Sequence, residues 1–254
     1  MVNLVLVSHS YTLACGVAEL AEQMNHGCQI AVAAGMEEPE NAIGTDAVRI
    51  MSAIEQVYSP DGVVILMDLG SAILSAETAL ELIDPEMAQH VKLCSAPLVE
   101  GTMAAVVAAS AGASLADVMA EAENALSAKQ TQLGGAEHAP LQAGSSPSYF
   151  AKRFVWTVQN PNGIHARPAA KVIETLSPFK AKVWAEVNQQ MVDARSYNQL
   201  IQLQIRAKQQ VTFYVEGEDS EQALTALKAL AETHFGEEVE ASKAICQENV
   251  LIQK

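Results

Sequence analysis

The sequence predicts an α/β fold made of two domains. Strand and helix signals alternate along residues 1–128, and a segment rich in Gly, Ser, Pro and Gln at residues 129–150 divides the chain. The alternation is typical of a mainly parallel sheet with helices on both faces. With 254 residues, 50% of them hydrophobic, the chain can bury two cores of ordinary size.

The first domain, residues 1–128, contains four predicted strands. They are Val2–Val7, Gln29–Ala34, Val63–Met67 and Val91–Cys94. The third is apolar at every position, as in a strand covered on both faces. The predicted helices are Leu13–Met24, a segment capped by Gly44–Asp46 and ending at Val57, Ser71–Leu82, Leu98–Ala111 and Leu115–Leu126.

The rest of the chain is predicted to contain a flexible linker, a second domain and a tail. Residues 129–150 lack apolar periodicity and are expected to be flexible. Residues 151–236 form the second domain, and residues 237–254, acidic at first, are left as a tail.

Charge divides unevenly between the two parts. Residues 1–144 carry 18 acidic and 3 basic side chains, whereas residues 151–236 carry 8 acidic and 10 basic ones. Neither part has the strongly basic character of a nucleic-acid-binding protein. A weakly basic domain tied to an acidic one favours transient docking of complementary surfaces.

The chain shows no sign of a membrane or export function. Met1 leads directly into the first apolar strand, and no apolar run approaches the length of a membrane span. The cysteines (Cys15, Cys28, Cys94 and Cys246) lack metal-ligand spacing. We therefore expect a cytoplasmic protein with reduced thiols and no metal site.

The segment Asn160–Ala170 carries the clearest chemical signal. Asn162-Gly163 is turn chemistry, and Pro168 fits the first turn of a helix, where its missing N–H costs nothing. His165 is therefore placed at a helix N-terminus, which favours bound anions. Arg167 can contact phosphoryl oxygens. This arrangement indicates a phosphohistidine carrier, with Asn162 as a further phosphoryl contact.

From about Lys152 to Phe235 the sequence resembles the HPr phosphocarrier of the bacterial phosphotransferase system. The resemblance rests on the Gly163–Ala170 motif, on strands at Arg153–Gln159, Lys182–Val187 and Val211–Glu216, and on a short helix opened by Ser196. It implies a β-α-β-β-α-β-α order in an α+β open-faced sandwich of four antiparallel strands. One departure is Asn188-Gln189-Gln190, which replaces the usual Asn-Gly turn.

In the first domain, polar residues follow the predicted strands where ligands bind in open α/β sheets. His9 follows the first strand, and Asp68 follows the third. We expect Asp68 to hold one ring nitrogen of His9. Ser10, Gly70 and Ser71 are expected to bind phosphoryl oxygens.

Residues 1–128 resemble the IIA-type domain of the DhaM family, which serves dihydroxyacetone kinases, and more distantly mannose-type IIA domains. The matching stretches are 5–10, 33–35, 43–48, 67–72 and 96–102. Fusion to an HPr-like domain is itself the arrangement of this family.

The resemblance implies a relay. Enzyme I phosphorylates His165 on Nδ1, His165 passes the group to Nε2 of His9, and His9 passes it to ADP on a separate kinase subunit. No cofactor is then needed on this chain, because ADP and Mg²⁺ belong to the partner. The other expected partners are a second copy of the chain, in a homodimer, and free HPr. Ser196 aligns with a serine that a kinase phosphorylates in HPr of some bacteria, although capping the short helix is its simpler role.

Two other functions fit the same residues. One is a mannose-type IIA–HPr fusion that phosphorylates a sugar-transporter IIB domain. The other is a regulatory protein whose phosphorylation state controls binding to a partner. The two complete phosphoryl sites weigh against regulation as the only function.

Overall fold

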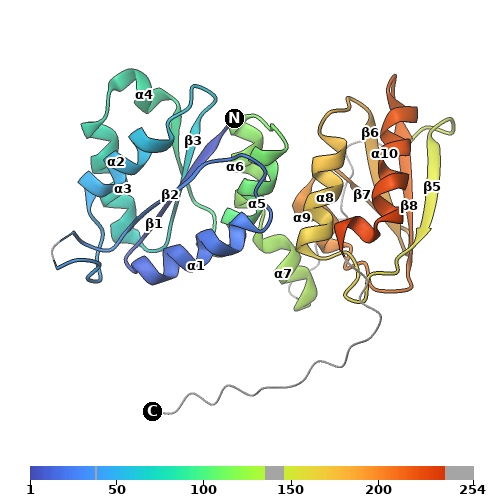
Figure 1. Ribbon diagram of the computed structural model, residues 1–254, viewed down its shortest axis with the longest axis horizontal. Helices are drawn as coiled ribbons and strands as arrows, with labels where there is room; N and C mark the ends of the chain where they lie inside the picture. The colour runs from blue at the N-terminus through green and yellow to red at the C-terminus, as the bar shows by residue number, and fades with distance from the viewer. Residues whose placement is uncertain (38, 135–145, 238–254) are drawn as a thin grey trace, which may run out of the picture.

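The computed structural model describes residues 1–37, 39–134 and 146–237. Within these ranges the chain forms two units, each built on a four-stranded sheet (Figure 1). The first sheet is parallel and the second antiparallel, which confirms the predicted fold class.

The parallel sheet has the order β2-β1-β3-β4. Its strands are β1 (Asn3–Ser8), β2 (Ile30–Ala34), β3 (Val63–Met67) and β4 (Val91–Cys94). The chain leaves β1 toward β2 but leaves β3 toward β4, in opposite directions across the sheet. The carboxyl ends of the adjacent strands β1 and β3 therefore form a topological switch point, where α/β proteins bind ligands.

Helices cover both faces of this sheet. They are α1 (Tyr11–Glu22), α2 (Ala47–Val57), α3 (Gly70–Leu82), α4 (Pro85–Gln89), α5 (Leu98–Ser110) and α6 (Leu115–Glu123). Because side chains alternate along a strand, β1 supplies Leu4 and Leu6 to one core and Val5 and Val7 to the other. The first core faces α1, α5 and α6, and the second faces α2 and α3. Helix α4 is not among the predicted helices; Asp84 caps it, and a proline follows at its first position.

The predicted linker begins too early. Residues 129–132 belong to a further helix, α7 (Leu126–Gln132), while residues 135–145 lie outside the described residues. Lys129 of this helix forms an ion pair with Glu100 of α5. Lys and Gln are good helix formers, so a polar composition alone did not distinguish this helix from a linker.

The second unit has the strand order β5-β8-β6-β7, with helices packed on one face (Figure 1). Its elements are β5 (Lys152–Thr157), α8 (Ala166–Leu176), β6 (Lys182–Val187), β7 (Gln190–Asp193), α9 (Tyr197–Gln202), β8 (Gln210–Glu216), α10 (Ser220–Glu232) and the 3₁₀ turn η1 (His234–Gly236). The order confirms the prediction. The unusual hairpin keeps a two-residue turn, because Asn188 and Gln189 both adopt positive φ angles of 51° and 68°.

Helices α8 and α9 contact the first unit. Asn198 Nδ2 of α9 donates to the carbonyl of Glu121 at 2.6 Å and to its carboxylate at 3.0 Å. Ser177 Oγ, at the end of α8, donates to the carbonyl of Ala111 at 2.5 Å. Tyr197 is buried, which raises its pKa to about 12. Buried apolar side chains of both units also form one continuous cluster.

Candidate active site

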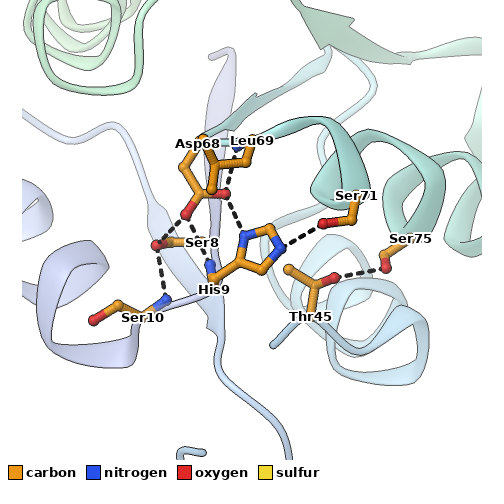
Figure 2. A network of polar contacts seen from close by, with 8 residues as sticks. All are labelled: Ser8, His9, Ser10, Thr45, Asp68, Leu69, Ser71 and Ser75. Carbon is orange, nitrogen blue, oxygen red and sulfur yellow. Dashed lines mark hydrogen bonds and ion pairs between the residues drawn. The ribbon is translucent and has the colours of Figure 1, made fainter. Parts of the chain in front are cut away.

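The switch point of the parallel sheet brings His9 and Asp68 together. His9 follows β1 directly, and Asp68 follows β3. Nδ1 of the imidazole lies 2.8 Å from Oδ1 of Asp68, with both side chains largely shielded from solvent. Figure 2 shows the carboxylate above the ring, where it also accepts hydrogen bonds from other groups.

Asp68 accepts four hydrogen bonds. Its donors are the His9 ring, the His9 backbone N–H and the Ser8 hydroxyl, each at 2.8 Å, and the Leu69 N–H at 2.7 Å. Burial by itself raises the pKa of Asp68, but these hydrogen bonds outweigh it and lower the pKa below its usual value. Asp68 is therefore a carboxylate at neutral pH, so Nδ1 of His9 is its hydrogen-bond donor.

The other ring nitrogen of His9 points toward the start of α3. Nε2 lies 2.5 Å from Oγ of Ser71 (Figure 2). The N-cap position of α3 is Leu69, whose side chain makes no capping hydrogen bond, so the N–H groups of Gly70 and Ser71 lie in an uncapped first turn. With Nδ1 protonated, Nε2 carries the lone pair and can act as a nucleophile beside these donors.

Ser10 lies close to His9 but faces another way. Its hydroxyl caps α1 by accepting from the Leu13 N–H at 3.3 Å, and Figure 2 shows it directed away from the imidazole. Its backbone N–H donates to Ser8 Oγ. The structure thus gives Ser10 a capping role where we expected a phosphoryl contact.

Two features around His9 are not predicted from the sequence. Ser8 is fully buried, and its hydroxyl links Asp68 to the Ser10 N–H. The hydroxyl groups of Thr45 and Ser75 are hydrogen-bonded to each other at 2.8 Å, and Figure 2 draws them together with the His9 ring. The sequence shows only that these polar residues lie at the end of β1, before α2 and within α3, and this does not specify their partners.

The second histidine sits in a tight turn before α8. The Gly163 N–H donates to the Asn160 carbonyl at 2.9 Å, closing a turn with Pro161 and Asn162 at its centre. Gly163 has φ +72°, and a Cβ there would lie 1.9 Å from the carbonyl oxygen of Ile205. Only glycine fits, because this carbonyl accepts the next N–H of the chain, from Ile164, at 2.8 Å.

His165 is the N-cap residue of α8 and Pro168 lies in the first turn, as predicted. Nε2 of His165 lies 2.8 Å from Oε1 of Glu237, so Nδ1 is the nitrogen left without this partner. Arg167 is exposed in the first turn of α8, and the ion pairs found among the described residues do not include it. Asn162 is exposed in the preceding turn.

The two sites use the same groups but leave different ring nitrogens free. In each, a carboxylate holds one imidazole nitrogen and leaves the other at a helix N-terminus: Nε2 for His9 and Nδ1 for His165. Within the described residues, His, Cys, Asp and Glu side chains form no group suited to a metal ion. In the same part of the chain, no helix has the length and apolar character to cross a bilayer.

Comparison with known proteins matches a separate family to each unit. Residues 3–119 match the model described as PTS system fructose IIA component, and residues 152–233 match PTS HPr component phosphorylation site. A phosphocarrier protein HPr of Lysinibacillus sphaericus is 36% identical over 75 residues, which cover 30% of this chain and 85% of the relative.

Relatives with a shared name match either part of the chain or nearly all of it. A Listeria innocua protein named PEP-dependent dihydroxyacetone kinase 2, phosphoryl donor subunit DhaM, is 38% identical over 107 residues, covering 42% of this chain and 85% of the relative. The chain belongs to the DhaM family. A DhaM protein of Klebsiella michiganensis is 47% identical over 249 residues, covering 96% of this chain and 53% of the relative. The chain thus spans about half the length of such DhaM proteins.

Proposed function

We propose that the chain is the phosphoryl relay of a PEP-dependent dihydroxyacetone kinase. Enzyme I phosphorylates His165, His165 phosphorylates His9, and His9 phosphorylates ADP held by a kinase subunit that converts dihydroxyacetone to its phosphate. The observation that carries this proposal is the pair of carboxylate-held histidines with opposite free nitrogens. The names of the DhaM relatives support the choice of kinase.

The transfer from His165 to His9 is a displacement at phosphorus between two nitrogens, whereas in the last transfer a terminal phosphate oxygen of ADP forms a P–O bond as the P–N bond to His9 breaks. The lone pair of the accepting nitrogen forms a P–N bond while the P–N bond to the donor breaks, and its electron pair returns to the donor ring. The proton on the opposite nitrogen stays in its hydrogen bond to Asp68 or Glu237, so no proton has to move. At His9 the N–H groups that open α3 and the Ser71 hydroxyl stabilise the phosphoryl oxygens. At His165 the exposed Arg167 and the start of α8 serve the same purpose.

The remaining parts of the system belong to other molecules in this proposal. ADP and Mg²⁺ bind the partner kinase subunit, and this chain needs no cofactor of its own. Enzyme I is a separate protein, free HPr can substitute for the second unit, and the chain acts as a homodimer in the cytoplasm.

The test is phosphoryl transfer from labelled phosphoenolpyruvate with purified enzyme I, the ADP-loaded kinase subunits and dihydroxyacetone. Wild type, His9→Ala and His165→Ala chains are compared with and without free HPr. We expect both substitutions to stop product formation without HPr, and HPr to rescue only His165→Ala. Product formation by His9→Ala would overturn the proposal, and label transfer to a transporter IIB domain would point to the sugar-transport alternative.

A further inference from the structure

Glu237 lies outside the part of the chain that matches the HPr model, which ends at residue 233. The sequence predicts that residues 237–254 are a tail. The carboxylate of Glu237 nevertheless reaches His165 at 2.8 Å and is largely shielded from solvent, with a relative side-chain exposure of 20%. The chain therefore returns after α10 to the start of α8.

A strained turn makes this return possible. His234 and Phe235 have φ angles of 52° and 55°, a left-handed conformation that costs free energy for residues with a Cβ, and Gly236 follows at 78°. Phe235 is anchored in the core with 1% exposure. Because burial of Phe235 offsets the strain, the direction of the chain at Glu237 is fixed by packing.

Asn160 completes the arrangement from the other side. It is fully buried, and Nδ2 donates to the carbonyl of His234 at 2.6 Å and to Oε2 of Glu237 at 2.8 Å. Both partners are acceptors, which fixes the orientation of the amide. Its Oδ1 has no hydrogen-bond partner among the described residues. A buried amide with one unsatisfied atom is a poor source of stability. The two hydrogen bonds that Asn160 does donate instead hold the turn at His234 and the carboxylate that reaches His165.

We propose that Asn160 and Glu237 are positioning residues that hold His165 in the tautomer with the proton on Nε2 and the lone pair on Nδ1. Two donors, Asn160 Nδ2 and His165 Nε2–H, face the two carboxylate oxygens. When Nδ1 takes up a phosphoryl group the ring becomes cationic, and Glu237 stabilises that charge. When the phosphoryl group leaves, a neutral imidazole with its proton on Nε2 remains. This inference rests on the proposed function, because it concerns how His165 takes part in the relay.

The direct test is the tautomer of His165 in the full chain, read from the ¹⁵N chemical shifts and ring couplings of its imidazole. We expect wild type to carry the proton on Nε2, and Glu237→Ala to show a mixture of tautomers. In Glu237→Gln an NH₂ group replaces one of the two oxygens that accept from Asn160 and His165. The variant cannot accept both hydrogen bonds, so we expect it to show a mixture of tautomers too. Asn160→Ala leaves the carboxylate unanchored and should have a smaller effect. Glu221→Gln removes an exposed glutamate that pairs with Lys152 and serves as the matched control.

A second readout measures reactivity without enzyme I. In a His9→Ala background, phosphoramidate supplies the phosphoryl group directly to His165. We expect Glu237→Ala to be phosphorylated about tenfold more slowly than the Glu221→Gln control, since one hydrogen bond to a charged group supports roughly that ratio. A wild-type proton on Nδ1, or a Glu237→Ala chain with wild-type tautomer and rate, would overturn the inference. Failure of enzyme I to phosphorylate wild type would instead count against the proposed function alone.

Discussion

The carboxylate of Asp68 is 2.8 Å from both the ring Nδ1 and the backbone N–H of His9. Asp68 therefore fixes the tautomer of the imidazole and the path of the chain that carries it. Asp68 can make both hydrogen bonds to His9 because β1 and β3 are neighbours and both end at the switch point of the sheet.

Asp68→Asn should slow phosphoryl transfer through His9 by up to about 10⁴-fold, the loss seen when the carboxylate partner of a catalytic histidine becomes an amide. An asparagine can donate to Nδ1, which would move the ring proton to Nε2 and remove the nucleophile. Rapid-quench measurement of label reaching His9 checks this. Asp84→Asn, which keeps a cap on the distant helix α4, is the control and should transfer at the wild-type rate.

The lowered pKa of Asp68 predicts a specific dependence of stability on pH. Its charged form is favoured in the folded chain, so its contribution is present above the unfolded pKa of about 3.9 and is lost as pH falls through the lower folded value. Urea unfolding of wild type and Asp68→Asn at several pH values measures this contribution. The gap between their free energies of unfolding should shrink below about pH 4; a gap that stays constant down to pH 2 would contradict the assignment.

The sequence was sufficient to predict the fold and the pairing of His9 with Asp68, for physical reasons. Val63–Met67 is apolar throughout, so the strand and the edge at which it ends could be located. The Gly163–Pro168 segment allows only a turn followed by a helix.

What the sequence did not predict depends on contacts between distant residues. Glu237 is 72 residues from His165, and its approach depends on left-handed angles at His234 and Phe235 that residue type does not indicate. The role of Ser10 was likewise ambiguous, because a serine before a helix suits both capping and phosphoryl binding.

Gly163→Ala should destabilise the second unit by more than 2 kcal/mol, because the new methyl group would combine a positive φ with a clash against the carbonyl of Ile205. Gly112→Ala is a matched control, with φ +78° but no atom within 4 Å of the added Cβ. It should cost about 1 kcal/mol. Chemical denaturation of both variants measures the difference, and equal losses would mean that the clash is relieved by movement of the 205–206 backbone.

Glu121→Gln should strengthen the contact between α6 and α9. Burial, chiefly, raises the pKa of Glu121, although the Ser196 hydroxyl and the Asn198 N–H act in the opposite direction. The stabilising contribution of a group with a raised pKa is present below its unfolded value, about 4.3, and is lost as pH rises through the folded one. At neutral pH the charge is therefore a cost, while a glutamine oxygen still accepts from Asn198.

Thermal unfolding checks the Glu121 prediction. The variant should gain up to about 1 kcal/mol at pH 7 and nothing near pH 4. Glu81→Gln changes an exposed glutamate and should show neither effect. A gain that persists unchanged at pH 4 would show that burial of the charge is not its cause.

A mixture of His9→Ala and His165→Ala chains should restore the product formation that each lacks alone. Among the contacts between the two units, those of α8 reach His26 and Ala111, which follow the C-terminal ends of α1 and α5, whereas His9 precedes α1. The 12 residues of α1 span about 18 Å, so this contact lies at the far end of the helix from His9. We therefore expect the second unit to leave this position to donate, which makes the His9 of another chain accessible. The measurement is product formation without free HPr, with each variant alone at the same total concentration as the control. An inactive mixture would mean that phosphoryl transfer stays within one chain.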